Sequence, residues 1–180
     1  MDDPRPHIGE PLAVDLLNTR WNYDGPHDLL SDVAGLRIWL ESNGLTQRCR
    51  ADEETRAALV AARDAIHAAV TSESTDALNA VLEHGRVRRE LAADGPNQVV
   101  EVTRQEWLPG YLAADNLLDL LTQGPDRIRQ CAGHACVLFF YDTSKNGKRR
   151  WHSMAACGNR EKAARNYARR TVRESGPSRG

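Results

Sequence analysis

Residues 131–157 read CAGHACVLFFYDTSKNGKRRWHSMAAC, and the spacing of their cysteines and histidines predicts how the C-terminal part of the chain folds. Four residues separate Cys131 from Cys136, and after fifteen more residues His152 and Cys157 repeat that interval. Three thiolates and an imidazole form a ligand set that structural tetrahedral zinc takes. We therefore predict one structural zinc per chain, because four protein ligands leave no open position for a reacting water.

Two other residues bear on this prediction. His134 lies inside the first pair and competes with His152 for the fourth position, although the equal spacing of the two pairs favours His152. Cys49 stands alone far upstream and is expected to be a partly buried small side chain. In a reducing compartment, this clustering of the other three cysteines favours metal binding over disulfides.

The residues between and after the two pairs have their own pattern. Residues 137–141 (VLFFY) predict a strand, 144–147 (SKNG) a turn and 149–151 (RRW) a returning strand. Cys157 then lies at the entrance of a helix, for which Asn159 is the expected cap. A knuckle, a hairpin and a helix around one metal resemble the treble-clef type of zinc finger. The metal supplies much of the folding free energy of such a small unit.

The charge is divided unequally along the chain. Residues 127–180 hold 13 Lys and Arg against 3 Asp and Glu, whereas residues 1–126 hold 11 against 22. The net charge of −1 therefore conceals a basic C-terminal part that attracts phosphate backbones and an acidic N-terminal part that repels them.

The basic residues of the C-terminal part are predicted to bind nucleic acid, although a solvated basic surface is the simpler alternative. Those on the hairpin are expected to contact phosphates, and those on the helix are expected to face the bases. Trp151 is expected to pack in the finger. The predicted contact residues are Lys145, Lys148, Arg149, Arg150, Arg160, Lys162, Arg165, Arg169 and Arg170.

The fold class that the whole sequence predicts is α+β. It comprises a mostly helical N-terminal domain with a small antiparallel β element, followed by a treble-clef-like zinc finger made of a hairpin and a basic helix. Residues 7–20 fit either a strand or a helix. The expected domains are 1–126, 127–174 and a tail, 175–180. Helices are expected over 31–43 (capped by Ser31), 52–70 (capped by Asp52), 75–84 and 111–123, a hairpin over 87–91 and 98–104, and a turn over 127–130.

The tetrapeptide Cys157-Gly158-Asn159-Arg160, with the RRW turn and the FFYDTS segment at 139–144, resembles the CGNR zinc finger family. That family normally has a cysteine where this chain has His152. The substitution keeps four zinc ligands, because imidazole also binds zinc. About fifty residues carry this resemblance.

The N-terminal part resembles the ABATE domain, which usually precedes this finger. The resemblance rests on Gly9 and on residues 12–20, LAVDLLNTR. It implies a stress-related transcription regulator that binds DNA through the finger. Asp15, Asn18 and Thr19 of this motif have two interpretations: local hydrogen-bonding residues, or the polar wall of a small-molecule pocket in a sensor domain.

Several function classes are disfavoured. No apolar run approaches the ~18 residues that cross a bilayer, and the first residues, MDDP, do not resemble a signal peptide. No nucleophile–base pair, phosphate loop or catalytic metal spacing is present, so we expect no enzyme. The predicted function is a cytoplasmic, zinc-dependent transcription regulator that binds double-stranded DNA. An effector at the N-terminal domain is a further candidate partner, and an adaptor for an acidic protein or an RNA-binding protein is the alternative.

Overall fold

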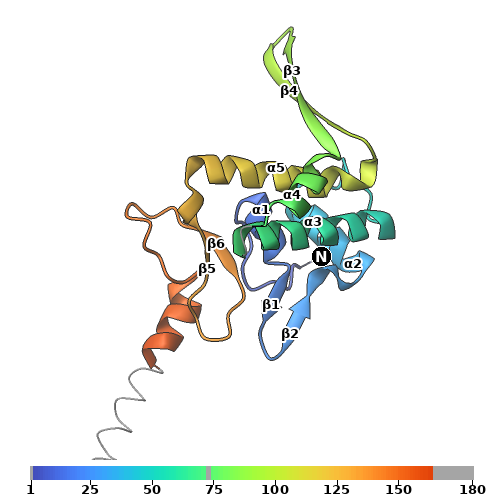
Figure 1. Ribbon diagram of the computed structural model, residues 1–180. Helices are drawn as coiled ribbons and strands as arrows, with labels where there is room; N and C mark the ends of the chain where they lie inside the picture. Colours follow the sequence, from blue (N-terminus) through green and yellow to red (C-terminus); the bar gives the residue numbers. More distant parts are fainter. Residues whose placement is uncertain (1, 72–73, 164–180) are drawn as a thin grey trace, which may run out of the picture.

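The computed structural model describes residues 2–71 and 74–163 (Figure 1). Helices dominate the N-terminal part, and three two-stranded antiparallel sheets complete the fold, which confirms the predicted α+β class. The helices are α1 Leu12–Leu17, α2 Val33–Ser42, α3 Glu53–Thr71, α4 Asp76–Leu82 and α5 Leu108–Gln123. The strand pairs are β1 Arg20–Asn22 with β2 Pro26–Asp28, β3 Gly85–Ala92 with β4 Gly95–Val102, and β5 Ile128–Gln130 with β6 Phe139–Tyr141. Short 3-10 turns are η1 Leu29–Ser31, η2 Gln105–Trp107 and η3 Pro125–Arg127.

Helices α2 and α3 each start at a side-chain cap. Asp52 caps α3 as predicted, because its Oδ1 accepts a hydrogen bond from the backbone N of Thr55 at 2.9 Å. The predicted cap of α2 was wrong: Asp32, one residue after Ser31, accepts from the backbone N of Gly35 at 2.8 Å. Residues 7–20, which fitted either a strand or a helix, contain α1.

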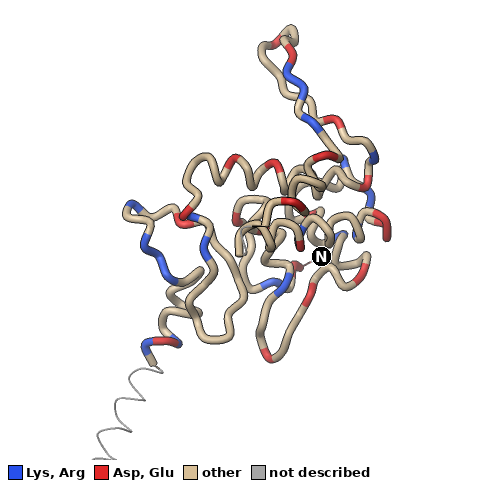
Figure 2. The backbone as a smooth tube through the Cα atoms, in the orientation of Figure 1, with Lys and Arg blue, Asp and Glu red and all other residues tan. Residues whose placement is uncertain are grey.

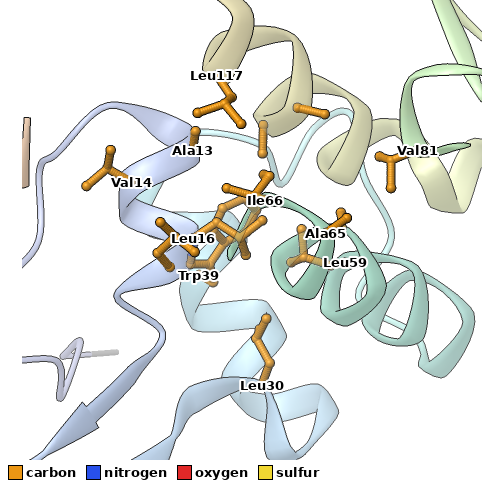
Figure 3. Close-up of a cluster of buried hydrophobic side chains, with 14 of the residues drawn as sticks. Ala13, Val14, Leu16, Leu30, Trp39, Leu59, Ala65, Ile66, Val81 and Leu117 are labelled. Atoms are coloured by element: carbon orange, nitrogen blue, oxygen red, sulfur yellow. The ribbon is translucent and has the colours of Figure 1, made fainter. Parts of the chain in front are cut away.

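One hydrophobic core holds the helices together (Figure 3). Leu16 of α1, Trp39 of α2, Ile66 of α3 and Leu117 of α5 are each fully buried in it. Cys49 is buried against the same core, and this burial raises the pKa of its thiol to about 11. It is therefore an unreactive core residue, separate from the other three cysteines.

The β3–β4 hairpin projects from the helical body (Figure 1). Its turn is shorter than predicted, because the strands extend to Ala92 and restart at Gly95, which leaves only Ala93 and Asp94 between them. Gly95 has a φ of 125°, a conformation that glycine adopts without steric cost and that lets the chain reverse so tightly.

The finger joins the core through β5 and β6. The predicted turn over 127–130 was wrong, because Ile128–Gln130 forms a strand that pairs with Phe139–Tyr141. The returning strand predicted over 149–151 was also wrong, since no strand is assigned there. The buried carboxylate of Asp142 accepts hydrogen bonds from the backbone N atoms of Ser144 and Arg149, at 2.9 and 2.8 Å. The backbone N of Arg149 is therefore bound to this side chain and not to a neighbouring strand.

Candidate metal centre

Cys131, Cys136, His152 and Cys157 meet at one point, with one ligand atom of each lying within 4.8 Å of the others. Sγ of Cys136 lies 3.6 Å from Nδ1 of His152. A tetrahedron with Zn–S of about 2.3 Å and Zn–N of about 2.0–2.1 Å has edges of roughly 3.5–3.8 Å. The donor set and its spacing therefore fit one tetrahedral zinc.

The knuckle that carries the first two ligands is tightly built. The backbone N of Cys136 donates to the backbone O of Gly133 at 3.0 Å, which closes the turn between Cys131 and Cys136. A Cβ at Gly133 would lie 2.9 Å from Sγ of Cys157, so any larger residue would displace a metal ligand. Ala135 completes the turn with a φ of 59°.

A short π-helix, η4 Met154–Gly158, positions the fourth ligand, Cys157. Ser153 caps it, since its Oγ accepts from the backbone N of Ala156 at 3.2 Å. Asn159 was therefore the wrong cap: the helical chain starts five residues earlier and continues through 159–163.

Burial sets the protonation of the ligand side chains. Burial, together with the charges of His7 and Arg149, lowers the pKa of His152 to about 4, so its imidazole is neutral and free to bind metal. Burial and the neighbouring thiols raise the pKa of Cys136 to about 12. Bound zinc favours the thiolate instead, because a coordinated thiol loses its proton. The four residues thus hold one structural zinc.

His134 is not part of this cluster among the described residues. It is exposed, and its backbone N donates to Oε1 of Glu161 at 2.9 Å. The equal spacing of the two ligand pairs therefore identified the correct histidine.

Comparison with known families agrees with this geometry. Residues 127–170 match the CGNR zinc finger. Residues 10–124, more than half of the chain, match the ABATE family, described as "Putative stress-induced transcription regulator". The chain belongs to the ABATE family. A comparison with curated proteins gave no match.

The ABATE region and the CGNR finger are joined by hydrogen bonds to β6. Both backbone polar groups of Phe139 pair with the side chain of Asn18, and the backbone N of Tyr141 donates to Oε2 of Glu10 at 2.9 Å. At the knuckle, Nδ2 of Asn22 donates to the backbone O of Ala135 at 3.1 Å. The ABATE region thus covers the edge of β6 that β5 leaves free.

The three residues of the predicted ligand pocket are buried and bonded within the protein. Asp15 accepts from Arg5 at 2.7 Å and from Asn43 at 3.0 Å. Asn18 binds Phe139, and the hydroxyl of Thr19 donates to the backbone O of Leu16 at 2.7 Å. These contacts favour the local structural interpretation, and a ligand role for the three residues stays a prediction.

The predicted nucleic-acid contacts fall into three groups. Five are exposed: Lys145, Lys148, Arg150, Arg160 and Lys162. Figure 2 shows Lys and Arg along the finger loop and in the last described turn of the helix after it. Arg149 is half-buried and donates to the backbone O atoms of Trp151 and His152, with its guanidinium 4.6 Å from the ring centre of Phe140. Arg165, Arg169 and Arg170 lie outside the described residues.

Sequence reasoning missed residues that support the site. His7 lies with its ring centre 4.9 Å from that of His152, and its Nε2 is 2.8 Å from Oε1 of Glu10. No local signal relates these residues to a ligand so distant in sequence. Asp142 was also missed, although an Asp two residues before a turn Ser is a recognisable turn signal. Trp151 packs in the finger cluster, as expected.

No helix of the described chain has both the length and the apolar character needed to cross a membrane.

Proposed function

We propose that this zinc-binding ABATE-family regulator binds duplex DNA through its finger and acts in the cytoplasm without catalysing a reaction. The observation that carries the proposal is the placement of exposed cations on a zinc-stapled scaffold. Lys148 and Arg150 lie on the loop before His152, and Arg160 and Lys162 lie on the helical turn after Cys157. Zinc thus fixes two cationic segments on one small unit, and a rigid positive surface suits a polyanion.

The two segments are assigned different tasks. Lys148 and Arg150 are exposed and suited to phosphate contacts, which set position without reading sequence. Arg149 supports the finger through its bonds to the backbone near His152, so we do not place it among the primary phosphate contacts. Arg160 and Lys162 lie on the helical segment, which is the element that a major groove admits.

The decisive experiment is selection of bound sequences from a random pool of duplexes, with single-stranded RNA as competitor. Affinity for the selected duplex is then measured against salt concentration. A DNA-binding finger loses affinity steeply as salt rises, with a log–log slope of about −0.9 for each phosphate neutralised. Preferential capture of the RNA would favour RNA binding, and failure to bind either nucleic acid would favour an adaptor that docks an acidic protein.

We also propose that the ABATE region senses a ligand. This proposal is supported by the contacts between Asn18 and Phe139 and between Glu10 and Tyr141, because a change in the ABATE region would reach β6 through them. Sensing requires two arrangements of the ABATE region relative to β6. A ligand shifts the balance between them only as far as its affinity for the two arrangements differs.

A further inference from the structure

A cavity of about 410 Å³ lies where the ABATE region meets the finger. This volume is in the range of small-molecule sites, roughly 300–1,000 Å³. Its walls come from β1, β2 and α3 on one side and from the segment between Cys136 and β6 on the other. Its lining includes Arg20, Trp21, His27, Arg63, Val137 and Phe139.

One wall of the cavity is aromatic. Trp21 and His27 are cross-strand partners in β1 and β2, and their rings stack with centres 5.0 Å apart and planes 9° apart. Val137 and Phe139 of the finger contribute apolar surface. A flat apolar ring system suits such a lining, because offset stacking adds to the free energy gained from burial.

The polar part of the lining holds two arginines and one aspartate. Arg63 is only 2 % exposed, and its two terminal nitrogens donate to Asp28 at 2.6 and 2.8 Å. Arg20 also contacts Asp28, at 3.3 Å, so two guanidinium groups share one lining carboxylate. Asp64, which pairs with Arg20 at 3.0 Å, is not among the cavity residues.

Arg63 also has an unused donor. Its Nε is buried and has no hydrogen-bond partner within the described part of the chain. Oδ1 of Asp64 lies 3.8 Å from this Nε, beyond hydrogen-bond distance. A buried donor left without a partner costs free energy, and an acceptor brought in by a ligand would remove that cost.

We infer that this cavity is the effector site and that it takes a small organic acid with a flat apolar body, the carboxylate meeting Arg20 and Arg63 and the ring lying against Trp21. The inference rests on the sensing role proposed above and gives it a site and a ligand class. The ligand would touch Val137 and Phe139 directly, so it would bridge the ABATE region and the strand that follows the first two zinc ligands.

The test is titration calorimetry on the full zinc-loaded chain, without DNA. The probes are benzoate, 2-naphthoate and 2-naphthamide, the last being a neutral match for the second. We expect 2-naphthoate to bind and 2-naphthamide to bind at least about tenfold more weakly. This difference in affinity corresponds to the loss of one hydrogen bond to a charged group. This comparison needs no variant and so does not depend on refolding.

Two variants locate the site. Val137→Phe fills the cavity from its half-buried finger wall and should abolish binding of 2-naphthoate. Arg20→Gln should weaken the binding of 2-naphthoate about two- to fivefold, as expected for the loss of a half-exposed ion pair. The control is Arg37→Gln, which changes an exposed arginine on α2 outside the lining and should leave the affinity unchanged. Zinc content and unfolding temperature check each variant.

Three results would overturn the inference: neither acid binds, the amide binds as tightly as the acid, or Val137→Phe retains full affinity. Because these titrations contain no DNA, they stand apart from the proposed DNA binding. If 2-naphthoate binds as expected while the finger fails to bind duplexes, the site survives and the DNA-binding proposal falls. If the acid does not bind but the finger does, the reverse holds.

Discussion

The side-chain amide of Asn18 pairs with both backbone polar groups of Phe139. Its Oδ1 accepts from the backbone N at 2.8 Å, and its Nδ2 donates to the backbone O at 3.0 Å. Both residues are buried, so no water replaces the amide if it is removed. One side chain thus takes the place of a neighbouring strand along the free edge of β6.

Asn18→Ala should therefore destabilise the whole chain. It leaves a buried N–H and a buried C=O without partners, at a cost of about 2–4 kcal/mol in the free energy of unfolding. Urea denaturation of the zinc-loaded protein measures the loss.

The matched control is Asn22→Ala, which removes an exposed hydrogen bond to Ala135 at the same interface. It should cost no more than about 0.5 kcal/mol, as surface substitutions usually do. Equal losses for the two variants would mean that Asn18 does not join the two parts of the protein.

His152 should be replaceable by cysteine but not by alanine. His152→Cys keeps four ligands of kinds that structural zinc accepts, so the purified variant should retain one zinc per chain. His152→Ala should lose zinc to a competing chelator that leaves the natural protein loaded. Metal analysis after dialysis gives the answer. Cys49→Ala is the control, because Cys49 is buried in the helical core; if it also lost zinc, the ligand assignment would need revision.

The exposed cations of the finger loop should set the salt dependence of DNA binding. The double variant Lys148→Ala, Arg150→Ala should flatten the log–log salt slope by about 1.8, which is about 0.9 for each lost phosphate contact. Binding in a fluorescence anisotropy titration should weaken for selected and scrambled duplexes alike. Arg86→Ala, an exposed change on the β3–β4 hairpin, should leave the slope unaltered. An unchanged slope in the double variant, with zinc still bound, would count against the proposed DNA surface.

Acid should destabilise the protein through Asp28. Burial alone would raise the pKa of this carboxyl, but the hydrogen bonds and charge of Arg63 outweigh burial and hold the pKa below its usual value. A lowered folded pKa contributes stability that is complete above the unfolded value of about 3.9 and is lost as the pH falls through the folded value.

The urea concentration at the unfolding midpoint should therefore be similar at pH 7 and pH 5 and lower at pH 3.5. Acid also releases zinc by protonating the cysteines, so the comparison that isolates Asp28 is with Asp28→Asn. That variant should be less stable at pH 7 and lose less on acidification. An identical loss in both proteins would mean that Asp28 does not carry the acid sensitivity.

The features predicted from the sequence were those with local causes. The zinc ligands follow from two equal spacings, and α3 follows from an acidic cap with apolar residues at helical spacing. The partner of β6 could not be predicted in this way. Residues 149–151 look like a returning strand, but Asp142 takes the backbone N of Arg149, and β6 pairs with β5 instead. The contacts of Asn18 and Glu10 with β6 join residues 121 and 131 positions apart, and no short-range pattern encodes them.

The shared edge of β6 limits how the finger can be moved onto another protein. A finger transplanted as a cassette from residue 127 onward would lose Asn18 and Glu10, which complete the hydrogen bonding of its own strand. A foreign host would have to supply an amide beside the backbone of Phe139 and a carboxylate beside the backbone N of Tyr141. Chimeric regulators built from this chain should therefore be cut before Gly9 rather than between the two matched segments.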